Sequence, residues 1–199
     1  ATTLNFTAAD VTNPTLSSST PADNATGVAV GANIVLTFNE NVAAGSGNIT
    51  LKKSSDNSTV QAMAVGGANV SISGATVTIN PSADLDSSQG YYLQIAATAI
   101  DDTSGNSYAG INDATTLNFI AVDNVSPTLA STTPADNATG VVPSANVVLT
   151  FSENVQVGSG NITVFKSDNT QVEAIDVTSG QVTVSGAAVT VNPSSNLDS

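Results

Sequence analysis

The sequence predicts an all-β fold built from tandem sandwich modules of about 113 residues each. Three observations lead to this prediction. A long stretch of sequence occurs twice, apolar and polar residues alternate over short runs, and Gly, Asn, Asp and Pro separate those runs. Alternation with a period of two is typical of strands with one buried face, and such turn residues end them. We expect no helix of useful length.

The repeat comes first, because it sets the length of a module. Residues 14–51 and 127–164 are identical at 28 of 38 positions, at an offset of 113 residues. The stretch "ATTLNFTAAD" at 1–10 also returns, as "ATTLNFIAVD" at 114–123, whereas residues 88–113 occur once. A window that is out of phase with its own repeat indicates a longer array.

The phase of the repeat predicts three pieces. Residues 1–10 are the last strand of a preceding module, residues 11–123 are a complete module, and residues 124–199 are the N-terminal two thirds of a following module. The third piece lacks counterparts of residues 88–121, which hold two expected strands. We therefore expect it to expose apolar faces and to be disordered, swapped or completed by another chain.

Strands of the complete module are expected wherever apolar residues share one face. In "NIVLTF", Ile34, Leu36 and Phe38 alternate, and in "YYLQIAA", Tyr91 and Leu93 begin a similar face. The expected strands lie at about 14–20, 33–39, 48–53, 58–65, 69–73, 76–80, 91–99 and 114–121. Eight short strands in about 110 residues fit an Ig-like β-sandwich.

The residues of "PADNATGV", which follows the first expected strand, favour a turn. Pro21 cannot donate to a strand ladder, so it belongs at an edge or a strand break. Asp23 and Asn24 favour a turn, and Gly27 tolerates positive φ. We expect this phrase to carry the chain from one sheet to the other.

Two adjacent tyrosines, Tyr91 and Tyr92, begin the strand expected at 91–99. Tyr91 is expected to pack beside Leu93 and to bond a backbone group near Leu85, as in a tyrosine corner. Tyr92 is then expected to face outward.

Composition excludes several classes of function. The net charge is −13, from three lysines (Lys52, Lys53, Lys166), sixteen acids and no arginine. Nucleic acids and anionic membrane surfaces need basic residues, so neither is an expected partner. No apolar run approaches a membrane span, so membrane insertion is not expected. Without Cys or His, thiolate chemistry and a Ser-His-Asp triad are impossible, and we expect no enzyme.

Calcium is the cofactor that this charge favours, because Ca²⁺ binds carboxylate and carbonyl oxygens. Asp10 and Asp123 end the last strand of a module and stand where an ion could bridge two domains. The loop "DDTSGN" could add further ligands. The candidate calcium ligands are Asp10, Asp123, Asp101, Asp102, Asn106 and Asp113. The alternative is plain turn chemistry, in which Asp and Asn are default residues.

Glu40 and Glu153 recur at one repeat position, in "FNENV" and "FSENV". An acid–base pair is one interpretation. An enzyme rarely copies its active site in every module, so we interpret both as solvated strand ends.

These motifs resemble the bacterial Ig-like domains of the SbsA S-layer type, as found in tandem arrays of large bacterial surface adhesins. The stretches that carry the resemblance are "PADNATGV", "NIVLTFNENV", "LDSSQGYYLQI" and "IDDTSGNSYAG". The resemblance covers essentially the whole chain. It implies tandem modules in large secreted or surface proteins, and therefore an extracellular or cell-surface location.

We accordingly expect a non-catalytic extender repeat of an extracellular surface or biofilm adhesin. Its expected partners are neighbouring Ig-like modules or copies of itself. Two alternatives stay open. One is a polymer-forming subunit of an S-layer or extracellular filament, with strand complementation between copies. The other is an accessory Ig-like region of a secreted polysaccharide-active enzyme.

Overall fold

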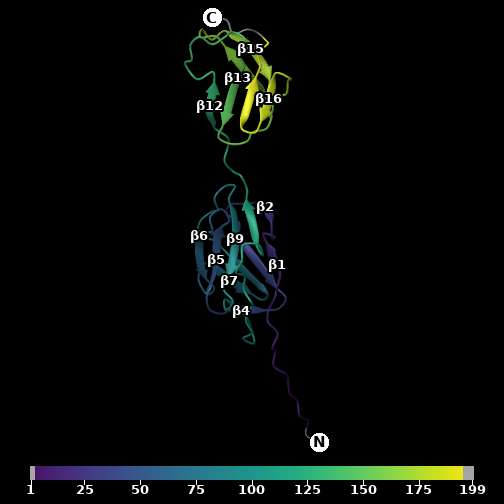
Figure 1. Cartoon of the computed structure of the whole chain (residues 1–199). Helices are drawn as coiled ribbons and strands as arrows, with labels where there is room; N and C mark the ends of the chain where they lie inside the picture. The colour runs from purple at the N-terminus through teal and green to yellow at the C-terminus, as the bar shows by residue number, and fades with distance from the viewer. Residues whose placement is uncertain (1–2, 195–199) are drawn as a thin grey trace. The chain divides into compact units, whose positions relative to one another are not determined.

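The computed structural model describes residues 3–194. Residues 1–2 and 195–199, at the outer ends of the two incomplete expected modules, lie outside the described residues. The chain divides into two compact units, unit 1 (Ala1–Asn124) and unit 2 (Val125–Ser199). All regular elements of the described residues are strands (Figure 1), which confirms the all-β prediction.

Unit 1 is a two-sheet sandwich with a short extra ribbon. Sheet A has the order β1 (Leu16–Thr20), β3 (Ile34–Phe38), β8 (Thr76–Ile79) and β7 (Val70–Ser73). Sheet B has the order β2 (Ala25–Val28), β11 (Asn118–Ala121), β9 (Gly90–Ile95), β5 (Asn48–Lys53) and β6 (Thr59–Ala64). The ribbon pairs β4 (Val42–Ala44) with β10 (Ile100–Asp102).

The "PADNATGV" turn joins the two sheets, as predicted. It links β1 in sheet A to β2 in sheet B, with φ of 69° at Gly27 and 60° at Asn24. Strand β2 then pairs with β11 in parallel, in a register that sets Ala25 opposite Phe119. Among the strands of the described residues, β2 has one neighbour in sheet B, which is β11.

The core of unit 1 lies between the sheets. Its centre is built from alternating residues of both sheets, among them Leu36, Ile49 and Leu93, none of which is exposed to solvent. Each such side chain contributes about 1.5–3 kcal/mol on full burial. The ring of Phe38 meets that of Tyr108 edge to face, with centroids 5.2 Å apart. The predicted alternation of apolar residues therefore forms a packed interior.

Three strands were not expected from the sequence. Strand β2 follows its turn at once, and β4 and β10 have three residues each, too few for a visible alternation. The strand expected at 91–99 ends at Ile95, because the chain turns there before β10 begins.

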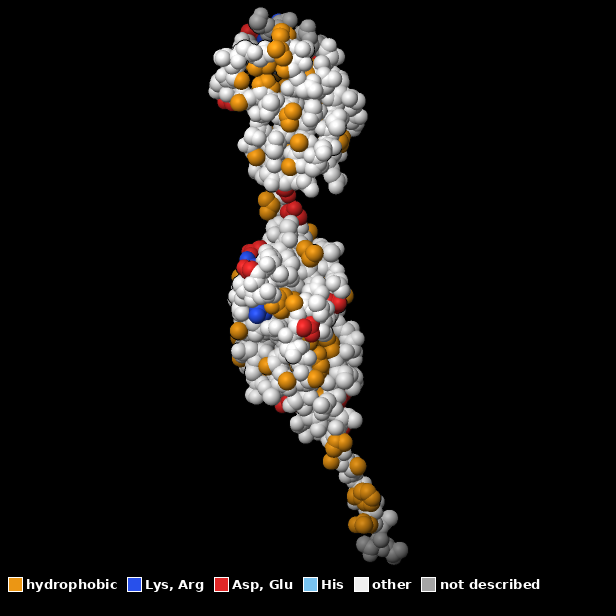
Figure 2. Space-filling model, viewed as in Figure 1, with side chains coloured by type: hydrophobic (Ala, Val, Ile, Leu, Met, Phe, Trp, Pro, Cys, Tyr) orange, Lys and Arg blue, Asp and Glu red, His pale blue; other side chains and the backbone are white. Residues whose placement is uncertain are grey.

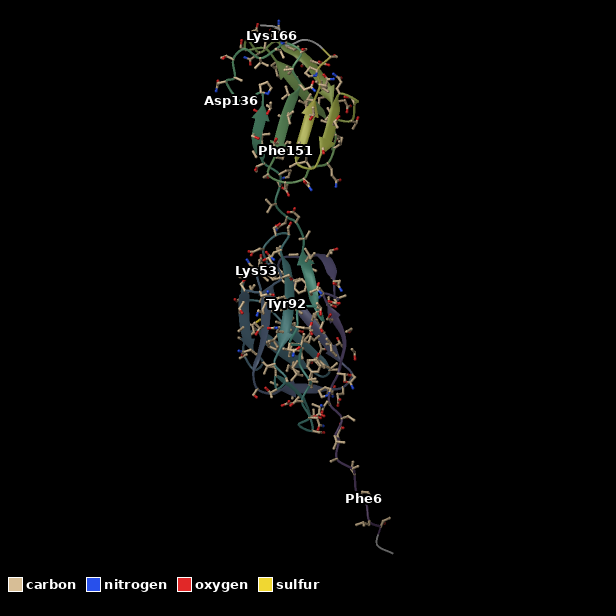
Figure 3. The ribbon with its side chains drawn as sticks, viewed as in Figure 1. Phe6, Lys53, Tyr92, Asp136, Phe151 and Lys166 are labelled. Atoms are coloured by element: carbon tan, nitrogen blue, oxygen red, sulfur yellow. The ribbon has the colours of Figure 1, made fainter. Side chains whose placement is uncertain are left out.

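The tyrosine pair behaves partly as predicted. The Asp86 N–H donates to the Tyr91 hydroxyl oxygen at 2.8 Å, which confirms the tyrosine corner. Tyr92 lies on the other face of β9, but it is only 3% exposed, so the expectation that it faces outward into solvent is wrong (Figure 3). Its hydroxyl donates to Asn57 Oδ1 at 3.1 Å, and the Lys52 ammonium lies 5.9 Å from its ring centroid.

Unit 2 repeats six of these strands. A four-stranded sheet has the order β12 (Leu129–Thr133), β13 (Val147–Phe151), β17 (Ala188–Val191) and β16 (Val182–Ser185), and a second sheet pairs β14 (Asn161–Phe165) with β15 (Gln171–Asp176). The counterparts of β2 and β4, at 138–141 and 155–157, are not strands. In unit 1 these two strands pair with β11 and β10, and the described residues of unit 2 contain no counterpart of either.

The core of unit 2 is correspondingly small. Ile175, Val189 and Val191 are its buried hydrophobic residues. Val147, Leu149 and Phe151, part of the apolar face that was expected to be exposed, are covered in part. They are half-buried, because they pack against this cluster together with residues such as Ile162 and Val182. A cavity of about 580 Å³, lined mostly by valine, leucine, isoleucine and phenylalanine, remains among them.

Candidate functional site

The loop after β10 folds around a buried carboxylate. Asp102 is 3% exposed. Its Oδ1 accepts hydrogen bonds from the backbone N–H groups of Ser104 and Asn106, both at 2.8 Å, and its Oδ2 accepts one from Asn106 Nδ2 at 2.7 Å. These bonds fix the direction of the Asp102 side chain, so the loop presents one carboxylate in a defined place.

Two further carboxylates lie beside it. Asp10, which precedes the first strand, and Glu40, which follows β3, each place an oxygen near Asp102, and the three oxygens lie within 4.8 Å of one another. Asn106 joins them, since its Nδ2 donates to the Asp10 carbonyl oxygen at 3.3 Å. The fold thus gathers acids from three segments that are far apart in sequence.

Hydrogen bonds keep two of these acids ionised. Burial of Asp102 acts to raise its pKa, but the hydrogen bonds from Asn106, Ser104 and Gly105 outweigh it, and the pKa is lowered. Hydrogen bonds from the Thr12 side chain and backbone lower the pKa of Asp10, although repulsion from Asp102 opposes them. Negative charge is therefore concentrated at this point near neutral pH.

Carboxylate oxygens are the type of ligand that a hard cation such as Ca²⁺ prefers. Ca²⁺ takes about 6–8 oxygen ligands at about 2.3–2.6 Å, from carboxylates, carbonyls and water. Asp10, Glu40 and Asp102 would hold such an ion, with carbonyl or water oxygens completing its shell. Bound there, the ion would tie the segment before β1 to the β10 loop. Calcium stays a prediction from the sequence.

The other predicted ligands make hydrogen bonds of their own, Asp101 within β10, Asp113 in the turn before β11 and Asp123 in the segment after β11. Asp101 accepts from the Ser107 hydroxyl at 2.6 Å, and Asp123 accepts from the Ser87 hydroxyl at 3.0 Å. Asp113 accepts from the backbone N–H groups of Thr115 and Thr116 and from both hydroxyls. The structure therefore brings together Asp10, Asp102 and Asn106 but places Asp101, Asp113 and Asp123 outside this cluster.

Glu40 is the residue that the sequence interpretation missed. It was expected to be a solvated strand end, whereas it is half-buried within the cluster. Its recurrence as Glu153 is the signal that could have found it, because Asp10 recurs as Asp123 at the same offset of 113 residues.

A hollow of about 460 Å³ in unit 1 offers no comparable chemistry. It crosses β5 and β9 and is lined by Gly, Asn, Thr, Gln, Ala and Ile residues, none of which titrates near neutral pH. Within residues 3–194, no helix is long and apolar enough to cross a membrane.

Comparison with known proteins identifies the kind of domain. The family described as bacterial Ig-like domain matches residues 10–120 and again residues 123–199. A comparison with curated proteins found no match.

Solved structures give more distant similarities. The S-layer protein rSbsC (31–844) has 16% sequence identity and a TM-score of 0.37, over 90% of this chain and 24% of that chain. The N-terminal part of the bacterial S-layer protein SbsC has the same identity and TM-score, over 94% of this chain and 42% of that chain. The N-terminal Ig1-2 module of the Drosophila receptor protein tyrosine phosphatase DLAR has 11% identity and a TM-score of 0.23, over 91% and 84%.

Proposed function

The chain belongs to the bacterial Ig-like domain family, and from this membership we propose that it is part of a tandem array of structural modules in an extracellular bacterial surface protein. In this role each module is a mechanical spacer. It holds another part of the protein, such as the binding region of a surface or biofilm adhesin, at a distance from the cell.

The repeat carries the proposal. Two copies of one sequence follow each other at an offset of 113 residues, and the family matches both. Unit 1 buries its own apolar layer between sheets A and B. A module with its own core can be added to an array without redesign of its neighbours, which is the property a spacer needs.

The surface chemistry supports the same role. A net charge of −13 with three lysines favours solubility. The chain has no histidine and no cysteine, and we propose that it is not catalytic. Some of its carboxylates accept hydrogen bonds within a turn, as Asp113 does, which is a structural use of acids.

Surface labelling tests the location. An antibody raised against residues 11–123 is expected to label intact cells of the source bacterium, and external protease should remove the signal. An antibody against a cytoplasmic protein is the control and should label only permeabilised cells. If the module antibody also labels only permeabilised cells, the proposed location is wrong.

Single-molecule pulling tests the mechanical role. The strands of unit 1 run from residue 16 to residue 121, so its unfolding releases about 350 Å of extended chain. We expect this length to appear in one step, because the two sheets share one core. Gradual extension without a distinct step would contradict the role of a spacer.

A further inference from the structure

The two ends of unit 1 are the points through which a stretched array pulls on it. The chain enters beside the end of β3, where the Thr15 N–H donates to Asn39 Oδ1 at 2.7 Å. It leaves beside the segment before β3, where the Val122 N–H donates to the Val28 carbonyl at 2.7 Å. These points lie at opposite ends of unit 1 (Figure 1), and Figure 2 shows its packed body narrowing to a single chain at each. Tension therefore acts roughly along the strands.

Strands β2 and β11 connect these two points. Strand β2 follows β1 on the entry side, β11 is the last strand before the exit, and the two pair in parallel. A pull on the entry draws β2 toward its N-terminal end, while a pull on the exit draws β11 toward its C-terminal end. Because the strands run in the same direction, the pair is sheared along its length. Its hydrogen bonds must then break together and not one after another.

Side-chain hydrogen bonds reinforce this pair. Asp23 Oδ1 accepts hydrogen bonds from the backbone N–H and from Nδ2 of Asn118, both at 3.0 Å. The Asn24 N–H donates to the Asn118 carbonyl at 2.7 Å, and the bond from Val122 to Val28 lies at the other end of the pair. We call these four bonds the β2–β11 clamp. They hold Asn118 through its backbone and its side chain at once.

The core depends on β11 far more than on β1. Leu117, Phe119 and Ala121 are each at most 2% exposed, and the Phe119 ring lies beside that of Tyr91, with centroids 6.0 Å apart. All five residues of β1 are exposed or half-buried. Loss of β1 would uncover little of the interior, whereas displacement of β11 would open it.

On its other side β11 is held to β9. The two strands pair antiparallel from Asn118 to Ile120. After β11, the Ser87 hydroxyl donates to Asp123 Oδ1 and accepts from the Asn124 N–H, both at 3.0 Å, which ties the exit to the loop before β9. The exit is thus anchored to the body of sheet B, and β2 is the neighbour of β11 that tension draws away.

We propose that the β2–β11 clamp carries the tension on unit 1 and that its rupture sets the force at which the module unfolds. This assignment rests on the mechanical role proposed above. It gives that role to named residues, with Asp23 and Asn118 as the side chains that strengthen the contact. Once β2 slides past β11, the core opens and the remaining strands separate.

Unfolding of the full 199-residue chain at constant force tests the clamp. The chain has no cysteine, so Ala8→Cys and Ser126→Cys supply attachment points on either side of unit 1. Asp23→Ala removes the acceptor of both Asn118 bonds, and it should raise the unfolding rate of unit 1 at a given force about 10-fold. Forced unfolding is governed by the unfolding rate, so a bond that breaks at the barrier is detected directly.

Gln61→Ala is the matched control. Gln61 Oε1 also accepts two hydrogen bonds, from the backbone N–H and the hydroxyl of Ser82 at 2.9 and 3.1 Å, but these join β6 to the segment after β8. Both variants should lower the free energy of unfolding in urea, measured by tyrosine fluorescence, because all three tyrosines lie in unit 1. Only Asp23→Ala should change the rate under force. Equal rises in rate, or no rise for Asp23→Ala, would overturn the proposal.

Asn118→Ala is the second variant, for use if Asp23→Ala does not fold. It removes the Nδ2 donor and keeps the backbone N–H, so the unfolding rate under force should rise by a smaller factor. An Asn118→Ala chain that unfolds at the parent rate would contradict the clamp. Gradual extension of the parent would count against the spacer role itself, whereas a sharp step with equal rates in all variants would count against the clamp alone.

The direction of the pull provides an independent test. Position 114 precedes β11, so attachment at Ala8→Cys and Ala114→Cys loads β2 and β11 from the same end of the parallel pair. The bonds of the clamp then open one at a time. Unit 1 should therefore unfold at a lower force than when it is pulled between positions 8 and 126. An equal or higher force would contradict shear of this pair.

Discussion

Carboxylates show at the residue scale how short polar contacts organise this chain. Asp102 orders the β10 loop through three hydrogen bonds, and Asp113 orders the turn before β11. In both cases the ionised form accepts the bonds, so its pKa is lowered. The same feature that marks a metal ligand in sequence can therefore serve a turn.

Asp113 gives a pH prediction. Hydrogen bonds from Thr115 and Thr116 lower its pKa from 3.8 to about 2. A folded-state pKa below the unfolded value means that the ionised form stabilises the fold above about pH 4, and that this contribution is lost as pH falls through 2. NMR titration of its carboxyl carbon should give a midpoint near 2. The difference in Tm between the parent and Asp113→Asn should narrow over the same range. A midpoint at 3.8 or above would contradict these hydrogen bonds.

Calcium gives a second prediction at this scale. If Asp10, Glu40 and Asp102 bind Ca²⁺, the Tm of unit 1 should be higher in Ca²⁺ than in EDTA, and ligand at 100 times its Kd would add about 2.7 kcal/mol. Glu40→Gln should reduce the rise, whereas Asp101→Asn, which changes an adjacent acid outside the cluster, should leave it intact. Equal Tm values in Ca²⁺ and EDTA would remove the calcium prediction.

Short strands depend on their neighbours at the element scale. Strands β2 and β4 each have one neighbour, β11 and β10, and the corresponding segments of unit 2 are not strands. A strand of three or four residues gains too little from its own sequence to persist without a ladder. Loops that bring such strands together are therefore essential to the fold.

In the loop between β10 and β11, the backbone at Gly110 lies close to the backbone of Ile95, and this close contact can be tested. A Cβ at Gly110, where φ is 79°, would lie 2.4 Å from the Ile95 carbonyl oxygen. Gly105 in the same loop has φ of 91° with nothing within 4 Å. Gly105→Ala should lower the free energy of unfolding by about 1–2 kcal/mol, because alanine disfavours positive φ. Gly110→Ala should lower it by about 2–5 kcal/mol, because the clash with the Ile95 carbonyl oxygen adds to the same conformational cost. Tyrosine fluorescence during urea unfolding reports unit 1 alone, because Tyr91, Tyr92 and Tyr108 all lie there. Equal costs would contradict the close contact.

The two units differ at the scale of the whole molecule, although their sequences repeat. The core of unit 1 includes buried residues of β9, β10 and β11, and the part of unit 2 that the structure describes contains no counterpart of these strands. Strand β3 of unit 1 is buried at alternate positions, whereas the corresponding strand β13 of unit 2 is half-buried at every position. Unit 2 should therefore be the less stable unit.

A matched pair of substitutions measures this difference. Leu36 is fully buried and its repeat counterpart Leu149 is half-buried. Leu36→Ala should cost about 2–5 kcal/mol, as in other well-packed cores, and Leu149→Ala less than half of that. Hydrogen exchange resolved by segment would report both units in the full chain. Equal costs would mean that unit 2 is packed as well as unit 1.

Much of the fold was predictable, because alternation and turn residues are local signals. The eight expected strands overlap β1, β3, β5, β6, β7, β8, β9 and β11, and the phrase at 19–28 joins the sheets as predicted. The site was less predictable. Of the six candidate ligands, Asp10, Asp102 and Asn106 lie together, while Glu40 was missed. These residues are 30 or more positions apart in sequence, except for Asp102 and Asn106, so their proximity depends on where the fold places the ends of β3 and β10.

The sequence by itself determined the module: its period, its strand pattern, its turns and its family. Tertiary structure decided which of these segments become strands. "ATGV" is a strand at 25–28 and not at 138–141, and "TLNF" contributes to β11 at 116–119 but is unpaired at 3–6. Identical residues have identical local preferences. The difference arises because a strand is stabilised by hydrogen bonds and apolar contacts to a neighbour, and only the folded chain supplies that neighbour.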